Sequence, residues 1–210
     1  MKLGRYQFGL VIGMVLGDGF LQKTGSRNAR LRLEHSLKQK EYLLWKVKQL
    51  KKLFSGKIHQ IKRMHPLTKS QYSYVRAQSN ATPELGRLRN IFYPCGKKKI
   101  PENLKDYLKE SVSLAIWFMD DGYYYKRDKC AFLYLGKIEK KEAEIVKETL
   151  KSNFGIETIV KDKKKKGFVL YFSPGETLKL KKIIEEFVIP QMKYKLPLDP
   201  VTTEDLYGLR

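Results

Sequence analysis

Two segments of this 210-residue chain repeat one pattern of mostly apolar residues followed by an Asp-Gly exit. They are Val11-Ile-Gly-Met-Val-Leu-Gly-Asp18-Gly19 and Leu114-Ala-Ile-Trp-Phe-Met-Asp120-Asp121-Gly122. Asp18 and Asp121 lie about half the chain length apart, and each apolar run is typical of a short buried helix. The spacing therefore predicts a duplicated unit in which two buried helices each end in one carboxylate.

The same order of elements is predicted after each Asp-Gly exit. After the first exit the residue patterns predict strands and helices at 30–36, 38–54, 57–63, 71–77 and 82–92. After the second exit they predict them at 123–126, 129–135, 139–154, 157–161, 168–172 and 173–187. The predicted fold is α+β, with two α-β-β-α-β-β-α units around a pseudo-two-fold axis and one antiparallel sheet in each unit. We expect a first unit at 1–95, a linker at 96–111 and a second unit at 112–210.

Glycine recurs every four residues in the first motif, at Gly9, Gly13 and Gly17, which leaves one helical stripe without side chains. A tightly packed core helix would explain a single copy of this pattern. Two such helices side by side would place Asp18 and Asp121 together at their C-terminal ends. The helix dipoles disfavour negative charge there, and the two carboxylates repel each other. A divalent ion removes this conflict, and oxygen-only ligands favour Mg²⁺.

The charge of the chain indicates the partner. Lys and Arg number 43 against 22 Asp and Glu, a net charge of +21. Clustered cations displace counterions from nucleic acid, so a polyanionic partner is expected. A basic structural protein of a ribonucleoprotein would explain the charge but not the duplication.

Cysteine usage and hydropathy indicate the compartment. The two cysteines, Cys95 and Cys130, lack the spacing of a structural zinc site and fit a reducing environment. The apolar run near the N-terminus is too short to cross a bilayer and offers no small-residue cleavage site. We therefore expect an intracellular protein of an organelle (mitochondrion or chloroplast) or of a prokaryotic cytoplasm, neither secreted nor membrane-bound.

Over nearly the whole chain, the two motifs and the runs Lys-x-Ile-Pro at 98–101 and Tyr-Lys-Leu-Pro at 194–197 resemble the LAGLIDADG homing endonucleases. The resemblance implies a monomer of the two-motif type that cuts both strands of a long double-stranded DNA target across the minor groove. Short 3′ overhangs and a role in intron mobility are implied as well. The alternative is a non-catalytic binder of the same fold, such as a regulator or a maturase with intron RNA as partner.

The resemblance also assigns the site residues. The eighth motif position, Asp18 and Asp121, is implied to be catalytic and to bind two or more Mg²⁺ ions, which Mn²⁺ or Ca²⁺ can replace. The seventh position, Gly17 and Asp120, adjoins the metal, with Asp120 not a primary ligand. Metal-activated water then needs no protein general base.

Two lysines are implied to lie near the scissile phosphates. They are Lys98 and Lys195, and Lys99 is an alternative to Lys98 because aligning the two Lys-x-Pro exits selects it.

Target recognition is expected from the two sheets, which would form a saddle with one parity of strand residues facing the major groove. The candidate contacts are polar, aromatic or cationic residues of the predicted strands and their turns: Gln22, Lys23, Arg30, Arg32, Glu34, His59, Lys62, Arg63, Gln71, Ser73, Arg76, Tyr123, Tyr125, Lys126, Lys129, Lys161 and Lys163.

Overall fold

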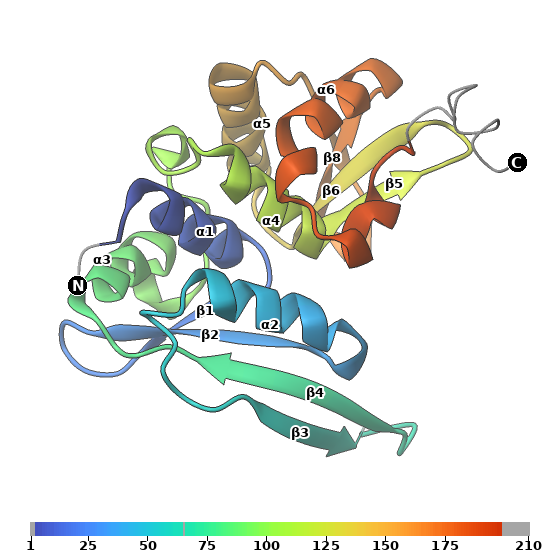
Figure 1. Ribbon diagram of the computed structural model, residues 1–210. Helices are drawn as coiled ribbons and strands as arrows, with labels where there is room; N and C mark the ends of the chain where they lie inside the picture. The colour runs from blue at the N-terminus through green and yellow to red at the C-terminus, as the bar shows by residue number, and fades with distance from the viewer. Residues whose placement is uncertain (1–2, 65, 199–210) are drawn as a thin grey trace, which may run out of the picture.

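The structure is a computed structural model that describes residues 3–64 and 66–198. The last residues of the predicted second unit, 199–210, lie outside the described residues, as do 1–2 of the first. The two motif helices, α1 (Arg5–Leu16) and α4 (Ser111–Asp121), pack against each other at the centre (Figure 1). Both are apolar on nearly all sides because both halves of the molecule cover them.

The elements follow each motif helix in the same order. In the first half they are β1 (Phe20–Lys23), β2 (Ala29–Ser36), α2 (Lys40–Gln49), β3 (His59–Met64), β4 (Gln71–Gln78) and α3 (Pro83–Phe92). In the second half they are β5 (Gly122–Tyr125), β6 (Cys130–Gly136), α5 (Lys140–Phe154), β7 (Ile159–Asp162), β8 (Phe168–Phe172) and α6 (Pro174–Ile184). Short 3₁₀ segments lie at Leu37–Gln39, Pro94–Gly96, Leu104–Asp106, Lys164–Lys166, Glu185–Phe187 and Pro190–Lys195.

Each half contains one four-stranded antiparallel sheet. The strand orders are β1-β2-β4-β3 and β5-β6-β8-β7, which are the same order in the two halves. The predicted α+β class and the duplicated unit are therefore confirmed. The division into 1–95, 96–111 and 112–210 stays a prediction.

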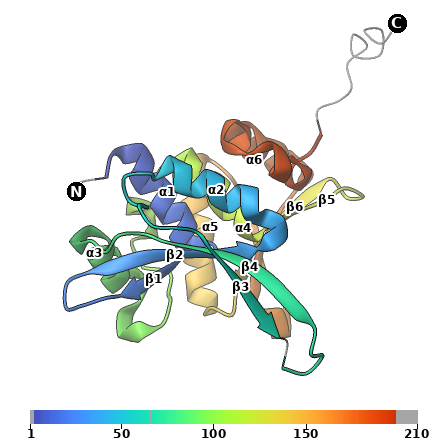
Figure 2. The ribbon, with the colours of Figure 1, turned by 60° about the horizontal axis from the view of Figure 1, so that its bottom comes forward.

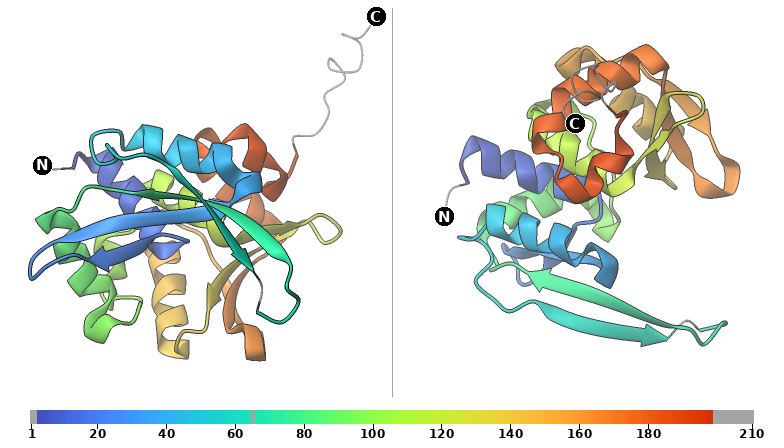
Figure 3. Two further views of the ribbon diagram at one scale, coloured as in Figure 1. Left: turned by 90° about the horizontal axis from the view of Figure 1, so that it is seen from below. Right: turned by 45° about the vertical axis from the view of Figure 1, so that its right-hand side comes forward.

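Helices cover one face of each sheet and leave the other face open. In the first half, α1, α2 and α3 lie on the same side of the sheet (Figure 1, and Figure 3, right). Figure 2 shows α2 lying along β2 on that side. Along β2 the side chains alternate between buried and half-buried, as expected for a strand with one face in the core.

The stripe of glycines is where α1 meets α4. A Cβ atom on Gly13 would lie 2.5 Å from the carbonyl oxygen of Ser113, and one on Gly9 would lie 2.9 Å from the Cβ of Glu110. The Ser113 hydroxyl donates a hydrogen bond of 2.8 Å to the Gly9 carbonyl. Glycine is therefore required here because the two backbones approach too closely for a side chain.

Two predicted helices are shorter in the structure. The helix predicted at 38–54 ends at Gln49, and Leu50, Leu53 and Phe54 reach the core from a non-helical turn. The apolar spacing thus marked core residues beyond the helix end. The helix predicted at 173–187 ends at Ile184 and continues as a 3₁₀ turn. None of the described helices has the length and hydropathy needed to cross a bilayer.

Candidate active site

The C-terminal ends of α1 and α4 bring the two motif carboxylates to one place. Asp18 follows α1, and Asp121 is the last residue of α4. Burial and the charges of Asp18 and Asp120 raise the pKa of Asp121 to about 7. Burial and the Asp120 charge also raise the pKa of Asp18, whose side chain remains 46% exposed. Burial and the neighbouring carboxylates therefore make the charged forms of both side chains costly, although Lys98 and Lys195 oppose this effect.

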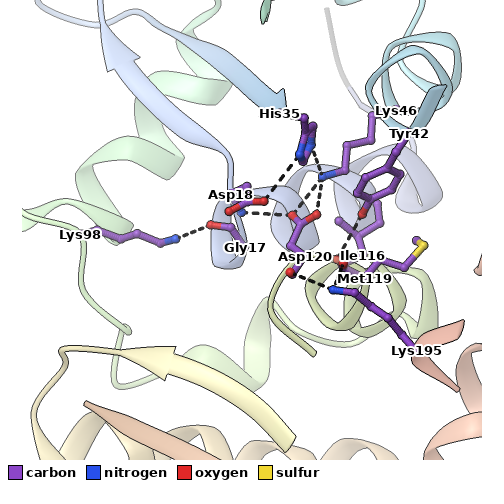
Figure 4. A network of polar contacts seen from close by, with 10 residues as sticks. All are labelled: Gly17, Asp18, His35, Tyr42, Lys46, Lys98, Ile116, Met119, Asp120 and Lys195. Atoms are coloured by element: carbon purple, nitrogen blue, oxygen red, sulfur yellow. Dashed lines mark hydrogen bonds and ion pairs between the residues drawn. The ribbon is translucent and has the colours of Figure 1, made fainter. Parts of the chain in front are cut away.

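Two lysines bind the ends of the motif helices in equivalent ways (Figure 4). Lys98 Nζ donates to the carbonyl oxygens of Leu16 (2.9 Å) and Gly17 (2.7 Å). Lys195 Nζ donates to those of Met119 (2.6 Å) and Asp120 (3.1 Å). The acceptors are the sixth and seventh motif positions in both copies. A cation at a helix C-terminus is stabilised by the macrodipole, so both lysines are held beside the carboxylates.

Lys99, the alternative to Lys98, points elsewhere. Its ammonium group forms an ion pair of 2.9 Å with Glu139, and both side chains are largely exposed. Burial lowers the pKa of Lys98, against the opposing effect of Asp121 and Asp18, whereas the hydrogen bond to Glu139 raises the pKa of Lys99. Lys98 is thus the lysine of this pair that lies at the carboxylates.

Asp120, which we expected beside the metal but not as a primary ligand, lies in a buried ion pair. Lys46 Nζ is 2.7 and 3.0 Å from the two Asp120 carboxylate oxygens, and both side chains are 0% exposed. Burial would raise the pKa of Asp120, but the Lys46 charge and the hydrogen bonds from Lys46 and the Asp18 N–H outweigh it and hold the pKa below its usual range. Because both oxygens already accept from Lys46, a metal ion at the Asp120 carboxylate would have to compete with this ammonium group.

His35 completes this cluster (Figure 4). Its Nε2 lies 3.1 Å from Lys46 Nζ, and its Nδ1 lies 3.6 Å from Asp18 Oδ2. Burial and the Lys46 charge lower the pKa of His35 to about 4, so the ring is neutral at pH 7. Lys46 can only donate, so Nε2 accepts and Nδ1 carries the proton. His35 therefore directs an N–H toward Asp18 and has no free lone pair for a metal.

The sequence interpretation missed Lys46 and His35. Lys46 occupies a buried position of α2 with Tyr42 and Leu43, where a charged residue is unusual. His35 lies at the inward parity of β2, after Leu31 and Leu33. A polar residue in an otherwise apolar stripe was the available signal in both cases.

Asp18 and Asp121 are carboxylates able to hold a divalent ion without displacing Lys46. Their oxygen donors suit Mg²⁺, and a bound cation would offset the burial and the carboxylate repulsion that together raise both of their pKa values. Ligand atoms of Asp18, His35 and Asp120 also lie within 4.8 Å of one another, but His35 and Asp120 both contact Lys46. The Gly17 carbonyl, which we also expected near the metal, accepts from Lys98. Beside Asp121 lies a pocket of about 370 Å³ whose lining includes Gly17 and Lys98.

The open face of the first sheet carries hydrogen-bonding groups. Glu34 Oε2 accepts from Arg63 (3.0 Å) and Arg76 (2.8 Å), so two arginines on neighbouring strands are held in place. Arg30 Nη1 donates to Gln78 at 3.3 Å. Among the described residues, Gln22 Oε1 and Arg30 Nε are buried without a partner. Such atoms require a further hydrogen-bonding group, which a bound molecule can supply.

The open face of the second sheet is aromatic. Tyr123, Phe132 and Tyr171 are cross-strand neighbours there. Lys161 Nζ lies 3.7 Å from the ring centre of Tyr171, and Lys163 Nζ lies 5.5 Å from that of Phe132. The faces of the two sheets therefore differ in chemistry although their backbones follow the same plan.

Some predicted DNA contacts lie elsewhere than expected. The strand register pairs Lys62 with Ser73 and Met64 with Gln71, which puts Lys62, Gln71 and Ser73 on the face opposite to Glu34. The sequence of β3 could not show which of its residues face the helices, because nearly every residue of this strand is exposed. Lys126 and Lys129, which we expected in strands, lie in the turn between β5 and β6, and Lys163 lies in the connection between β7 and β8. Lys23 pairs with the buried Ala29 and so has the inward parity too, at the end of the edge strand β1. The others lie on the open faces of the sheets: Arg32, His59 and Tyr125.

The chain belongs to the LAGLIDADG DNA endonuclease family, whose model matches residues 8–180. The resemblance seen in the two motifs is thereby confirmed.

Known relatives agree with this assignment. The chain is 29% identical to probable intron-encoded endonuclease 1 of Wickerhamomyces canadensis, over 92% of this chain and 85% of that protein. It is 30% identical to RecA of Mycolicibacterium flavescens, over 93% of this chain but 47% of that protein. It thus spans about half the length of the RecA relatives.

A solved structure shares the fold closely. The homing endonuclease I-WcaI bound to its DNA recognition sequence matches with a TM-score of 0.86 and 25% identity, covering 95% of this chain and 89% of that chain. I-DmoI in complex with DNA and Mn matches with a TM-score of 0.52 and 16% identity, covering 85% and 95% of the two chains, which shows the fold alone.

Proposed function

We propose that this protein is a site-specific endonuclease that cuts both strands of a long DNA target. The observation that carries the proposal is the meeting of Asp18 and Asp121 at the ends of two equivalent helices, between one sheet with a polar open face and one with an aromatic face that bears lysines. Two equivalent carboxylates between two DNA-facing sheets would serve one strand each. Double-stranded DNA also matches the net charge of +21.

The carboxylates and lysines would divide the chemistry between them. Asp18 and Asp121 would hold Mg²⁺, which Mn²⁺ or Ca²⁺ can replace, and a bound ion would activate water and stabilise the leaving oxygen. Lys98 and Lys195 place positive charge where charge develops on the phosphate. The sheets would fix the register of the DNA, with Arg63 and Arg76 reading base edges and the lysines contacting phosphates.

Further features of the proposed activity follow the family. We propose a monomer that cuts across the minor groove, leaves short 3′ overhangs and promotes intron mobility in an organelle or a prokaryotic cytoplasm. A non-catalytic binder of the same fold would bind DNA without cutting it.

Cleavage of a DNA library tests this proposal. The purified protein is incubated with a library of long random duplexes, with Mg²⁺ and with a chelator, and the ends that form are sequenced. We expect double-strand ends at one family of related sequences in Mg²⁺ alone. Tight DNA binding without metal-dependent cutting would instead indicate the non-catalytic binder.

Lys98 and Lys99 offer a matched pair of substitutions. We expect Lys98→Met to slow cleavage by about 10²–10³-fold, the typical cost of removing one electrostatic group from an active site. Lys99→Met removes the same charge from an exposed ion pair and should leave the cleavage rate within a few-fold of the parent. Single-turnover rates on the selected target measure both. Equal rates for the two variants would remove Lys98 from the site.

A further inference from the structure

The buried Lys46–Asp120 pair exists in only one of the two half-sites. Asp120 occupies the seventh motif position, where the first copy has Gly17. On α2, Lys46 comes three residues after the buried pair Tyr42 and Leu43. On α5, Val146 comes three residues after the buried pair Glu142 and Ala143, so it is the equivalent of Lys46. The two halves therefore share a backbone plan but not this charge pair.

The pair reaches the backbone of Asp18. The Asp18 N–H donates to Asp120 Oδ2 at 3.1 Å, while Lys46 fixes the same carboxylate from the other side. A Cβ on Gly17 would collide with that Asp120 oxygen, so glycine is what lets the carboxylate approach. Asp121, in contrast, is the last residue of α4, and its own helix holds its backbone.

The difference matters because Asp18 has left its helix. Gly17 has non-helical backbone angles (φ −83°, ψ −130°), and Asp18 follows it in a turn. Asp18 contacts Asp120 of α4 and His35 of β2. These long-range contacts hold Asp18 in place, since it is not part of a helix. A carboxylate that must hold an ion beside a scissile phosphate loses rate when it is misplaced by about 1 Å.

We propose that Lys46 and Asp120 are positioning residues for Asp18 alone, so that cutting of the DNA strand served by Asp18 depends on them and cutting of the other strand does not. This inference rests on the proposed endonuclease function. Without Lys46 the buried Asp120 carboxylate would lose its counter-charge and its fixed orientation, and Asp18 would lose its anchor.

Strand-specific kinetics test the inference. The target from the library selection carries a different label on each strand, and the two cutting rates are compared for the parent and for Lys46→Met. We expect one strand to slow by about 10²-fold relative to the other. The control, Val146→Ala, perturbs the equivalent buried position of α5 and should leave the ratio of the two rates unchanged.

A double variant separates positioning from misfolding. Lys46→Met with Asp120→Asn removes both buried charges, and the Asn oxygen can still accept from the Asp18 N–H. We expect its strand ratio to return toward the parental value. If Lys46→Met slows both strands equally, or if the double variant is as unbalanced as Lys46→Met alone, the proposal is overturned.

An Mg²⁺ titration gives a result independent of cleavage. The amide resonances of Asp18 and Asp121 are followed as Mg²⁺ is added to the parent and to Lys46→Met. We expect Lys46→Met to shift the free Asp18 amide resonance and weaken its response to Mg²⁺, with the Asp121 response kept. If the Asp18 amide of Lys46→Met responds to Mg²⁺ as it does in the parent, the positioning proposal is overturned, even if no DNA is cut. If the amide resonances behave as expected but the parent does not cut DNA, the endonuclease function alone is overturned.

Discussion

Asp18→Asn and Asp121→Asn are each expected to abolish double-strand cleavage while leaving DNA affinity equal to or tighter than that of the parent. Asn keeps the shape of the side chain but removes the charge that would hold the ion. Because the lost charge lies near phosphate, binding should not weaken. Cleavage in Mg²⁺ and equilibrium binding in Ca²⁺, both on the selected target, measure the two effects.

The matched control is Asp106→Asn, which makes the same chemical change at an exposed residue of the 3₁₀ segment Leu104–Asp106. It should cut and bind as the parent does. If Asp18→Asn or Asp121→Asn cuts at close to the parental rate, the active site that we propose is wrong.

Gly13→Val is expected to lower the free energy of unfolding by about 3 kcal/mol, at the upper end of overpacking effects. The added Cβ would lie 2.5 Å from the Ser113 carbonyl oxygen, so a backbone of α1 or α4 must move. For a chain of this length that loss corresponds to a fall in melting temperature of about 6–12 °C. Thermal unfolding followed by circular dichroism measures it.

Gly175→Ala is the control for this substitution. No heavy atom lies within 4 Å of a Cβ built there, and the residue is in the first turn of α6. Its melting temperature should equal or slightly exceed that of the parent because Ala favours helix over Gly. A parental melting temperature for Gly13→Val would mean that α1 and α4 do not meet at this glycine.

The architecture was predictable because its signals are local and repeated. Alternation along β2 and the apolar motif runs each identify an element, and their recurrence after Gly19 and Gly122 identifies the duplication. The close approach of α1 and α4 also followed from the spacing of Gly9 and Gly13, since side-chain-free turns are visible in a sequence.

The cluster behind Asp18 could not be predicted in the same way. Lys46, His35 and Asp120 come from three elements, and their contact depends on how α2 and β2 lie against α4. The choice between Lys98 and Lys99 likewise depends on the direction of side chains in a loop, which residue spacing does not determine. The cluster and the choice of lysine are both determined by tertiary packing.

The chemistry of the sheet faces was only partly readable. Residue types identified Arg63, Arg76 and Glu34 as polar, but their mutual ion pairs depend on cross-strand register. One consequence is that Glu34 holds two arginines in fixed positions before any DNA binds, which favours directional hydrogen bonds to bases.

Mapping both ends of the cut in the library experiment tests the central claim most directly. If Asp18 and Asp121 serve one strand each across the minor groove, every cut molecule should show two breaks, one per strand, offset to give short 3′ overhangs and dependent on Mg²⁺. Breaks confined to one strand, breaks that persist in chelator, or DNA bound tightly and never cut would contradict it.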